Sequence, residues 1–171
     1  MIPALKFPLM KKWFLTVVPL LFVLMAVTQT DTVYPYKRFP TVPPFSLLQA
    51  DSSLLTKAQL KKGPVLVMFF SPSCDHCQHQ VSDMLKRMAE FKNTQFVLAT
   101  YQPFEEMVEF ISTYELSKHP NIKVGRDEKF VLPPFYHIQS LPFLAVYNKK
   151  GDLVNTWQGN VPVDDLLKAL H

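Results

Sequence analysis

Residues 65–77 read VLVMFFSPSCDHC, and this stretch decides the fold. Six consecutive apolar residues at 65–70 predict a buried strand. A short turn at 71–73 then leads into a helix that is expected to begin at Cys74. A sulfur at a helix N-terminus lies among free N–H groups and at the positive end of the helix dipole, and both stabilise a thiolate. Because thiolates attack disulfides, the stretch indicates redox chemistry.

The composition fits a single domain that folds without a disulfide framework. The chain has 171 residues and two cysteines, Cys74 and Cys77, and a chain of this length buries a core large enough to be stable. A purely structural bridge is therefore the weaker interpretation. Three of the 18 basic residues, Lys6, Lys11 and Lys12, precede residue 28, which leaves 15 Lys and Arg against 14 Asp and Glu in the rest. This balance disfavours nucleic acid as a partner.

The N-terminal segment, residues 1–30, is predicted to be a targeting sequence. Lys11 and Lys12 precede an apolar run at 13–27, which is the pattern of an export signal. The run is short for a membrane-spanning helix, which needs about 20 residues, yet no clear Ala-x-Ala cleavage site follows it. A cleaved signal peptide and an N-terminal membrane anchor both remain open. Either one takes the domain out of the cytoplasm.

A Pro-rich linker is predicted at 31–44, ahead of a folded domain at 45–171. Pro35, Pro40, Pro43 and Pro44 punctuate this linker, a composition typical of a tether.

The hydrophobic periodicity of the domain predicts an α/β fold. A helix beginning at Cys74 connects two apolar strands, and a helical crossover of this kind makes the strands parallel. Further on, the loop at 148–152 indicates a β-hairpin. The expected elements are a strand at 45–48, a brief helix at 57–61 capped by Thr56, a strand at 65–70, a helix from Cys74 to about Asn93, a strand at 95–101, a helix at 104–114, strands at 121–124, 143–147 and 153–157, and a closing helix at 163–170.

Two stretches in the second half of the domain resemble thioredoxin. They are YHIQSLPFL at 136–144 and the hairpin loop NKKGD at 148–152. Together with the CxxC after an apolar strand, they extend the resemblance to the thioredoxin fold from about residue 42 to 170. The resemblance implies a central mixed sheet flanked by helices. It also implies that Pro142 is a cis proline facing the cysteines, and that Leu141 and Pro142 offer a backbone edge to a substrate chain.

The exported N-terminus, the Pro-rich lead-in and the extra segment at 103–134 make the chain similar to membrane-linked thiol-disulfide oxidoreductases of the TlpA/ResA type. The similarity implies a thioredoxin fold with an inserted helical segment before the cis-proline and an N-terminal hydrophobic targeting helix. It further implies an enzyme of the bacterial periplasm or cell envelope that reduces protein disulfides and is recycled by a membrane or periplasmic electron donor. Cys74 is expected to attack the substrate and Cys77 to resolve the mixed disulfide. No cofactor is implied beyond this redox-active pair.

Three positions depart from the pattern of these families. Ser73 precedes the first cysteine where Trp is common, Met68 stands in place of thioredoxin's buried carboxylate, and Gln80 replaces a Glu found in many TlpA/ResA-type reductases. Water or His76 is therefore expected to accept the proton. The two residues between the cysteines are predicted to modulate the thiolate in opposite directions, since a cationic His76 favours it and the Asp75 carboxylate disfavours it.

An alternative function uses the same two sulfurs without catalysis. A soft ion such as Cu(I) held between Cys74 and Cys77 would make the protein a copper carrier or assembly factor. A zinc site that adds His76 and His79 is disfavoured, because neighbouring residues of one helical turn point in different directions and no second ligand pair exists. No resident metal is therefore expected, and the sequence favours an exported thiol-disulfide oxidoreductase.

Overall fold

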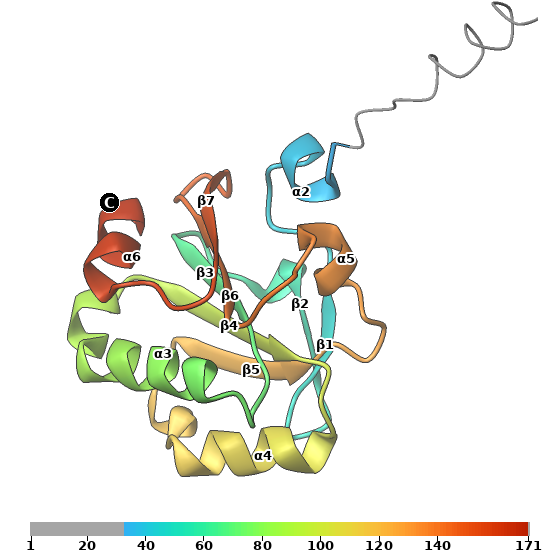
Figure 1. Ribbon diagram of the computed structural model, residues 1–171, viewed down its shortest axis with the longest axis vertical. Helices are drawn as coiled ribbons and strands as arrows, with labels where there is room; N and C mark the ends of the chain where they lie inside the picture. The colour runs from blue at the N-terminus through green and yellow to red at the C-terminus, as the bar shows by residue number, and fades with distance from the viewer. Residues whose placement is uncertain (1–32, 171) are drawn as a thin grey trace, which may run out of the picture. The chain divides into compact units, whose positions relative to one another are not determined.

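The computed structural model describes residues 33–170 (Figure 1). The predicted targeting segment therefore lies outside the described residues, as does the start of the predicted linker. Within the described range, none of the helices has the length and apolar character needed to cross a membrane.

A seven-stranded mixed sheet forms the centre of the fold (Figure 1). The strands are β1 (Ser46–Leu48), β2 (Leu54–Thr56), β3 (Val65–Phe69), β4 (Gln95–Thr100), β5 (Ile122–Arg126), β6 (Phe143–Tyr147) and β7 (Leu153–Gln158). They lie in the order β2-β1-β5-β4-β3-β6-β7. β3, β4 and β5 are parallel, because helices connect them in sequence, whereas β6 runs antiparallel to both β3 and β7.

Helices cover both faces of this sheet (Figure 1). On one face lie α3 (Asp75–Lys86), α4 (Phe104–Thr113) and α6 (Val163–Leu170), which contribute to one hydrophobic cluster. On the other face lie α2 (Pro35–Arg38) and α5 (Leu132–Tyr136), which contribute to a second cluster. The mixed sheet flanked by helices confirms the predicted fold class.

The sequence of β3 explains why both faces are covered. Leu66 and Met68 belong to the cluster beneath α3, whereas Val65, Val67 and Phe69 belong to the cluster beneath α5. Successive side chains of a strand point to opposite faces, so a strand that is apolar at every position needs a cover on each side. All five residues of β3 are buried, as the unbroken apolar run predicts.

The remaining predicted elements are present, β6 and α6 with the predicted bounds and the others with shifted ends. The helices α2 and α5 were not predicted, and two further features differ. The helix from the cysteines ends at Lys86, because Arg87 leaves the helical conformation, and a short 3₁₀-helix (Met88–Phe91) covers the stretch toward Asn93. The strand β2 was not predicted. Only its central residue, Leu55, is buried, so three residues give too little alternation to indicate a strand.

The structure also differs from the predicted linker, over residues 34–44. Val42 is buried in the core, and the Leu153 N–H donates a hydrogen bond to the Pro40 carbonyl oxygen at 2.7 Å. The ring of Tyr34 stacks on His137 with 4.0 Å between ring centroids. Residues from Tyr34 onward belong to the same compact unit as the sheet. Composition alone suggested a tether because prolines are frequent in linkers. Prolines only fix φ, however, and leave the neighbouring apolar side chains free to pack on the domain.

Candidate active site

The first cysteine lies at the N-terminus of α3, directly after the turn that follows β3. Its N–H donates to the Ser71 carbonyl oxygen at 3.1 Å, which closes the turn, and its own carbonyl oxygen accepts the N–H of Gln78 at 3.0 Å. The Cys77 N–H points at the Cys74 Sγ, 3.4 Å away. Cys74 is therefore the N-cap of the helix, and its sulfur occupies the place where a helix binds an anion.

The two sulfurs differ in their surroundings. Both cysteines are free thiols; Cys74 is half-buried, whereas Cys77 is fully buried. Burial raises the pKa of the Cys77 thiol, and the hydrogen bond with Cys74 raises this pKa further. The structure therefore combines one accessible sulfur at a helix terminus with one thiol that is shielded and kept protonated.

This difference predicts unequal alkylation of the reduced protein. Cys74 should react with iodoacetamide at least about 100-fold faster than Cys77, because the reagent needs an accessible thiolate and Cys77 offers neither access nor charge. Peptide mass spectrometry of timed samples measures both rates, and labelling in denaturant serves as the control in which they converge. Equal alkylation rates in the folded protein would contradict the assignment of Cys74 as the accessible sulfur and Cys77 as the shielded one.

The two residues between the cysteines point their side chains into solvent. Asp75 and His76 are both exposed, and within residues 33–170 neither side chain forms a hydrogen bond to a cysteine. The backbone at His76 is fixed, because its carbonyl oxygen accepts a hydrogen bond from Asn160 Nδ2 at 2.7 Å. Asp75 and His76 are therefore next to the cysteines in the chain, but their side chains form no hydrogen bond with either sulfur in the described residues.

The predicted substrate edge lies beside the cysteine turn. The Leu141–Pro142 peptide bond is cis. Because antiparallel β6 pairs Phe143 with Phe69 of β3, Pro142 falls level with Phe70, the residue just before the turn. Pro142 is buried and Leu141 is half-buried. Leu141 packs against the same hydrophobic cluster as Cys74. The pairing of β3 with β6 brings the two segments to the same end of these strands.

One side chain holds the segment that precedes Pro142. Gln158 Oε1 accepts the N–H groups of Gln139 and Ser140, each at 2.9 Å. The Gly159 N–H donates to the Pro142 carbonyl oxygen at 2.7 Å. The end of β7 thereby fixes the backbone on both sides of the Leu141–Pro142 bond.

The comparisons with known proteins agree with this geometry. A family model described as a thioredoxin-like domain matches residues 52–171. The chain belongs to the thioredoxin-like domain family. Several of the solved structures that it matches are described as thiol:disulfide interchange proteins or disulfide oxidoreductases. The thioredoxin-like protein SkfH of Bacillus subtilis is 26% identical over 109 residues, which cover 62% of this chain and 76% of SkfH.

Solved structures share the fold of this thioredoxin-like protein at low sequence identity. A thiol:disulfide interchange protein of the thioredoxin family from Chlorobium tepidum matches with a TM-score of 0.65 and 17% identity, over 82% of this chain and 97% of that one. A secreted disulfide oxidoreductase from Mycobacterium tuberculosis matches with a TM-score of 0.61 and 21% identity, over 74% and 93% of the two chains. These likenesses support the fold.

Gln80 fixes the active-site helix of this thioredoxin-like protein to the loop after β7. Its side chain is 1% exposed. Gln80 Nε2 donates to the Val161 carbonyl oxygen at 3.1 Å, and Gln80 Oε1 accepts the Val161 N–H at 2.7 Å. An amide can donate and accept at once, whereas a carboxylate can only accept. Gln80, which departs from the Glu implied by the TlpA/ResA resemblance, therefore has a structural role that the sequence did not reveal.

Buried acids do not replace the missing proton acceptor. Met68, at the position of thioredoxin's carboxylate, is fully buried. Asp127 is the one buried charged residue in the described part of the chain. Its two oxygens accept the N–H groups of Val131 and Leu132 at 3.0 and 2.8 Å, at the start of α5. This carboxylate is thus engaged in capping a helix.

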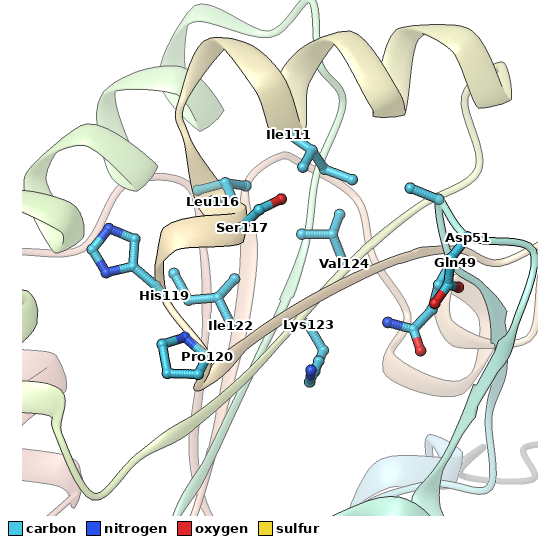
Figure 2. Close-up of a pocket in the computed structure, with 11 residues that line it drawn as sticks. Gln49, Asp51, Ile111, Leu116, Ser117, His119, Pro120, Ile122, Lys123 and Val124 are labelled. Carbon is cyan, nitrogen blue, oxygen red and sulfur yellow. The ribbon is translucent and has the colours of Figure 1, made fainter.

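Two other kinds of site have to be distinguished from the dithiol site, a metal site and a second groove. Within residues 33–170, no group of three or more His, Cys, Asp or Glu side chains is arranged to hold a metal ion. A groove shown in Figure 2 has Gln49 and Asp51 on one side and His119 and Pro120 on the other. It lies toward the amino end of β5, whereas the cysteines follow the carboxyl end of the parallel strand β3. It is therefore no part of the dithiol site.

Proposed function

We propose that this protein reduces disulfide bonds of other proteins outside the cytoplasm. The observation that carries the proposal is the pairing of an accessible sulfur, Cys74, at a helix N-terminus with a buried thiol, Cys77, one helical turn behind it. Dithiol exchange needs one sulfur that a partner can reach and one that is held back until a mixed disulfide forms.

The reaction passes two electrons to the substrate. The Cys74 thiolate attacks one sulfur of the substrate disulfide, so that a mixed disulfide forms and the other substrate sulfur leaves as a thiolate, which takes a proton. Cys77 then loses its proton and attacks Cys74 Sγ. The Cys74–Cys77 disulfide forms, and the second substrate sulfur is released as a thiol. With Met68 and Gln80 unable to accept the Cys77 proton, water is proposed to accept it.

The substrate chain is proposed to lie along the backbone at Leu141 and Pro142. This segment is next to the cysteine turn and is fixed by Gln158, so an extended chain that pairs with it places its disulfide near Cys74. The export pattern of the N-terminal segment and the secreted relative from Mycobacterium tuberculosis support a location in the periplasm or cell envelope. There a membrane or periplasmic donor must reduce the pair again.

The reduction potential of the Cys74–Cys77 pair tests this proposal. Equilibration of the full-length protein with glutathione or dithiothreitol buffers should give about −200 mV or lower, in the range of reductants such as glutaredoxins and thioredoxin. The reduced protein should also reduce the disulfides of a folded protein substrate. A potential near −120 mV, the level of the strong oxidant DsbA, would overturn the direction of electron flow and leave the exchange chemistry standing.

A Cu(I) carrier, the alternative, is not favoured by the site. Two thiolates must face one ion, yet the Cys77 thiol is buried and its pKa is raised, which favours the protonated form. Metal analysis after anaerobic purification separates the two functions. Copper at one equivalent per chain, lost on replacement of either cysteine, would support the carrier.

A further inference from the structure

A groove of about 420 Å³ opens beside the first cysteine, between α3 and α4. Both helices lie on the same face of the sheet (Figure 1). One wall comes from the cysteine turn and the first turn of α3, and the other comes from one side of α4. The lining residues are Pro72, Ser73, Gln78, Glu106, Glu109, Phe110, Thr113 and Tyr114.

The groove reaches the catalytic turn and has an aromatic base. Ser73, which is exposed, immediately precedes Cys74, so an occupant of the groove lies one residue from the nucleophile. Phe110 is buried, and its ring centroid lies 4.7 Å from that of Phe70 and 4.6 Å from that of Tyr114. Packed aromatic rings of this kind offer a firm apolar surface to the stem of a long side chain.

The charged residues that line the groove are both acidic. Glu106 and Glu109 are three residues apart on α4 and line the groove together. Asp75 lies three residues before Gln78, on the same side of α3. Burial raises the pKa of Tyr114, and the negative charge of Asp75 raises it further. No Lys, Arg or His lines it, and within residues 33–170 none of the three carboxylates forms an ion pair.

We propose that this groove binds a Lys or Arg side chain of the substrate polypeptide, close to the cysteine that Cys74 attacks. The aliphatic stem lies against Phe110 and Tyr114, and the cationic head lies between Glu106 and Glu109. The proposal rests on the proposed function, because it concerns how the same sulfur selects its substrates. A groove that is acidic and is lined by the residue before the nucleophile favours disulfides flanked by basic residues over those flanked by acidic ones.

Three peptide disulfides that differ in one residue beside the cysteine, Lys, norleucine or Glu, test this selectivity. The reduced full-length protein should reduce the Lys peptide about fivefold faster than the norleucine peptide at low salt, and the Glu peptide more slowly still. Added salt should shrink the differences, because the carboxylates are solvent-accessible. Norleucine keeps the apolar stem and removes the charge, so the comparison isolates the electrostatic part.

Glu106→Gln and Glu105→Gln form a matched pair of variants. They are adjacent on α4 and change the net charge equally, but Glu105 does not line the groove. Glu106→Gln should lower the Lys-to-norleucine rate ratio by about half or more, and Glu106→Gln/Glu109→Gln should bring it close to one, whereas Glu105→Gln should leave it unchanged. Ser73→Trp should also lower the Lys-to-norleucine rate ratio, because the indole ring would fill the end of the groove next to Cys74.

The outcomes separate this proposal from the proposed function. If the protein reduces all three peptides at equal rates, or if both single variants change the ratio equally, the groove has no role in recognition while disulfide reduction stands. If the reduced protein fails to reduce even the norleucine peptide and a small neutral disulfide, the proposed function itself is overturned.

Discussion

Replacing Cys77 with serine should leave Cys74 covalently joined to its partner proteins. In the wild type, Cys77 attacks the mixed disulfide from one helical turn away and releases the substrate, so the intermediate is short-lived. Serine keeps the size and the buried place of the side chain but cannot attack. Mixed disulfides should therefore accumulate at least about tenfold, as non-reducing electrophoresis and mass spectrometry of the captured partners can measure.

The opposite substitution provides the control. Cys74→Ser removes the accessible sulfur, so both capture and disulfide reduction should fall to the uncatalysed level, because Cys77 is buried and its pKa is raised. Equal capture by the two single variants would contradict the division of roles between the sulfurs. It would also imply that the helix opens to expose Cys77 during the reaction.

The variant Gln80→Glu should be destabilised by about 3 kcal/mol or more at neutral pH. The wild-type amide donates to the Val161 carbonyl oxygen in a buried site, whereas a carboxylate there would face that oxygen with no proton to offer. Burial and this repulsion raise the pKa of the introduced carboxyl group in the folded variant above the unfolded value of about 4.3. The folded state then binds more protons, so stability relative to the wild type falls as pH rises from about 4 through the folded-state pKa.

Urea unfolding at a series of pH values measures this effect. The difference in the free energy of unfolding between Gln80→Glu and the wild type should be smallest near pH 4. It should grow by at most about 1.4 kcal/mol per pH unit as the pH rises. Gln80→Met is the matched control, since it keeps the length of the side chain, loses both hydrogen bonds and adds no titrating group. The loss of stability in Gln80→Met should not vary with pH. If the free energies of unfolding of the two variants depend on pH in the same way, no buried carboxylate forms in Gln80→Glu.

The fold and the place of Cys74 at a helix N-terminus were predictable because their signals are local in the sequence. An unbroken apolar run followed by a turn and CxxC specifies a buried strand and a helix that starts at Cys74. The Leu141–Pro142 step ahead of a hairpin was recognisable from a resemblance to thioredoxin. Both segments are found where they were expected, at the same end of the paired strands β3 and β6.

The supporting contacts were not predictable because they join residues far apart in the chain. Gln80 and Val161 are 81 residues apart, and a polar residue on a helix gives no sign of whether its partner is water or a distant backbone. The same holds for Gln158, which fixes the segment before Pro142. Only the departure of Gln80 from the Glu that the TlpA/ResA resemblance implies drew attention to it in advance. The acidic groove likewise depends on how α4 packs beside α3.

The packing of residues 34–44 on the domain bears on how shortened versions of the protein should be designed. A fragment beginning at Phe45, the boundary suggested by the prolines, would remove Val42 from the core and the Pro40 carbonyl from its hydrogen bond with Leu153. It would also uncover the face of His137 on which Tyr34 stacks, in the segment that leads to Pro142. An intact folding unit therefore starts at Tyr34, and fragments for biochemistry should keep it.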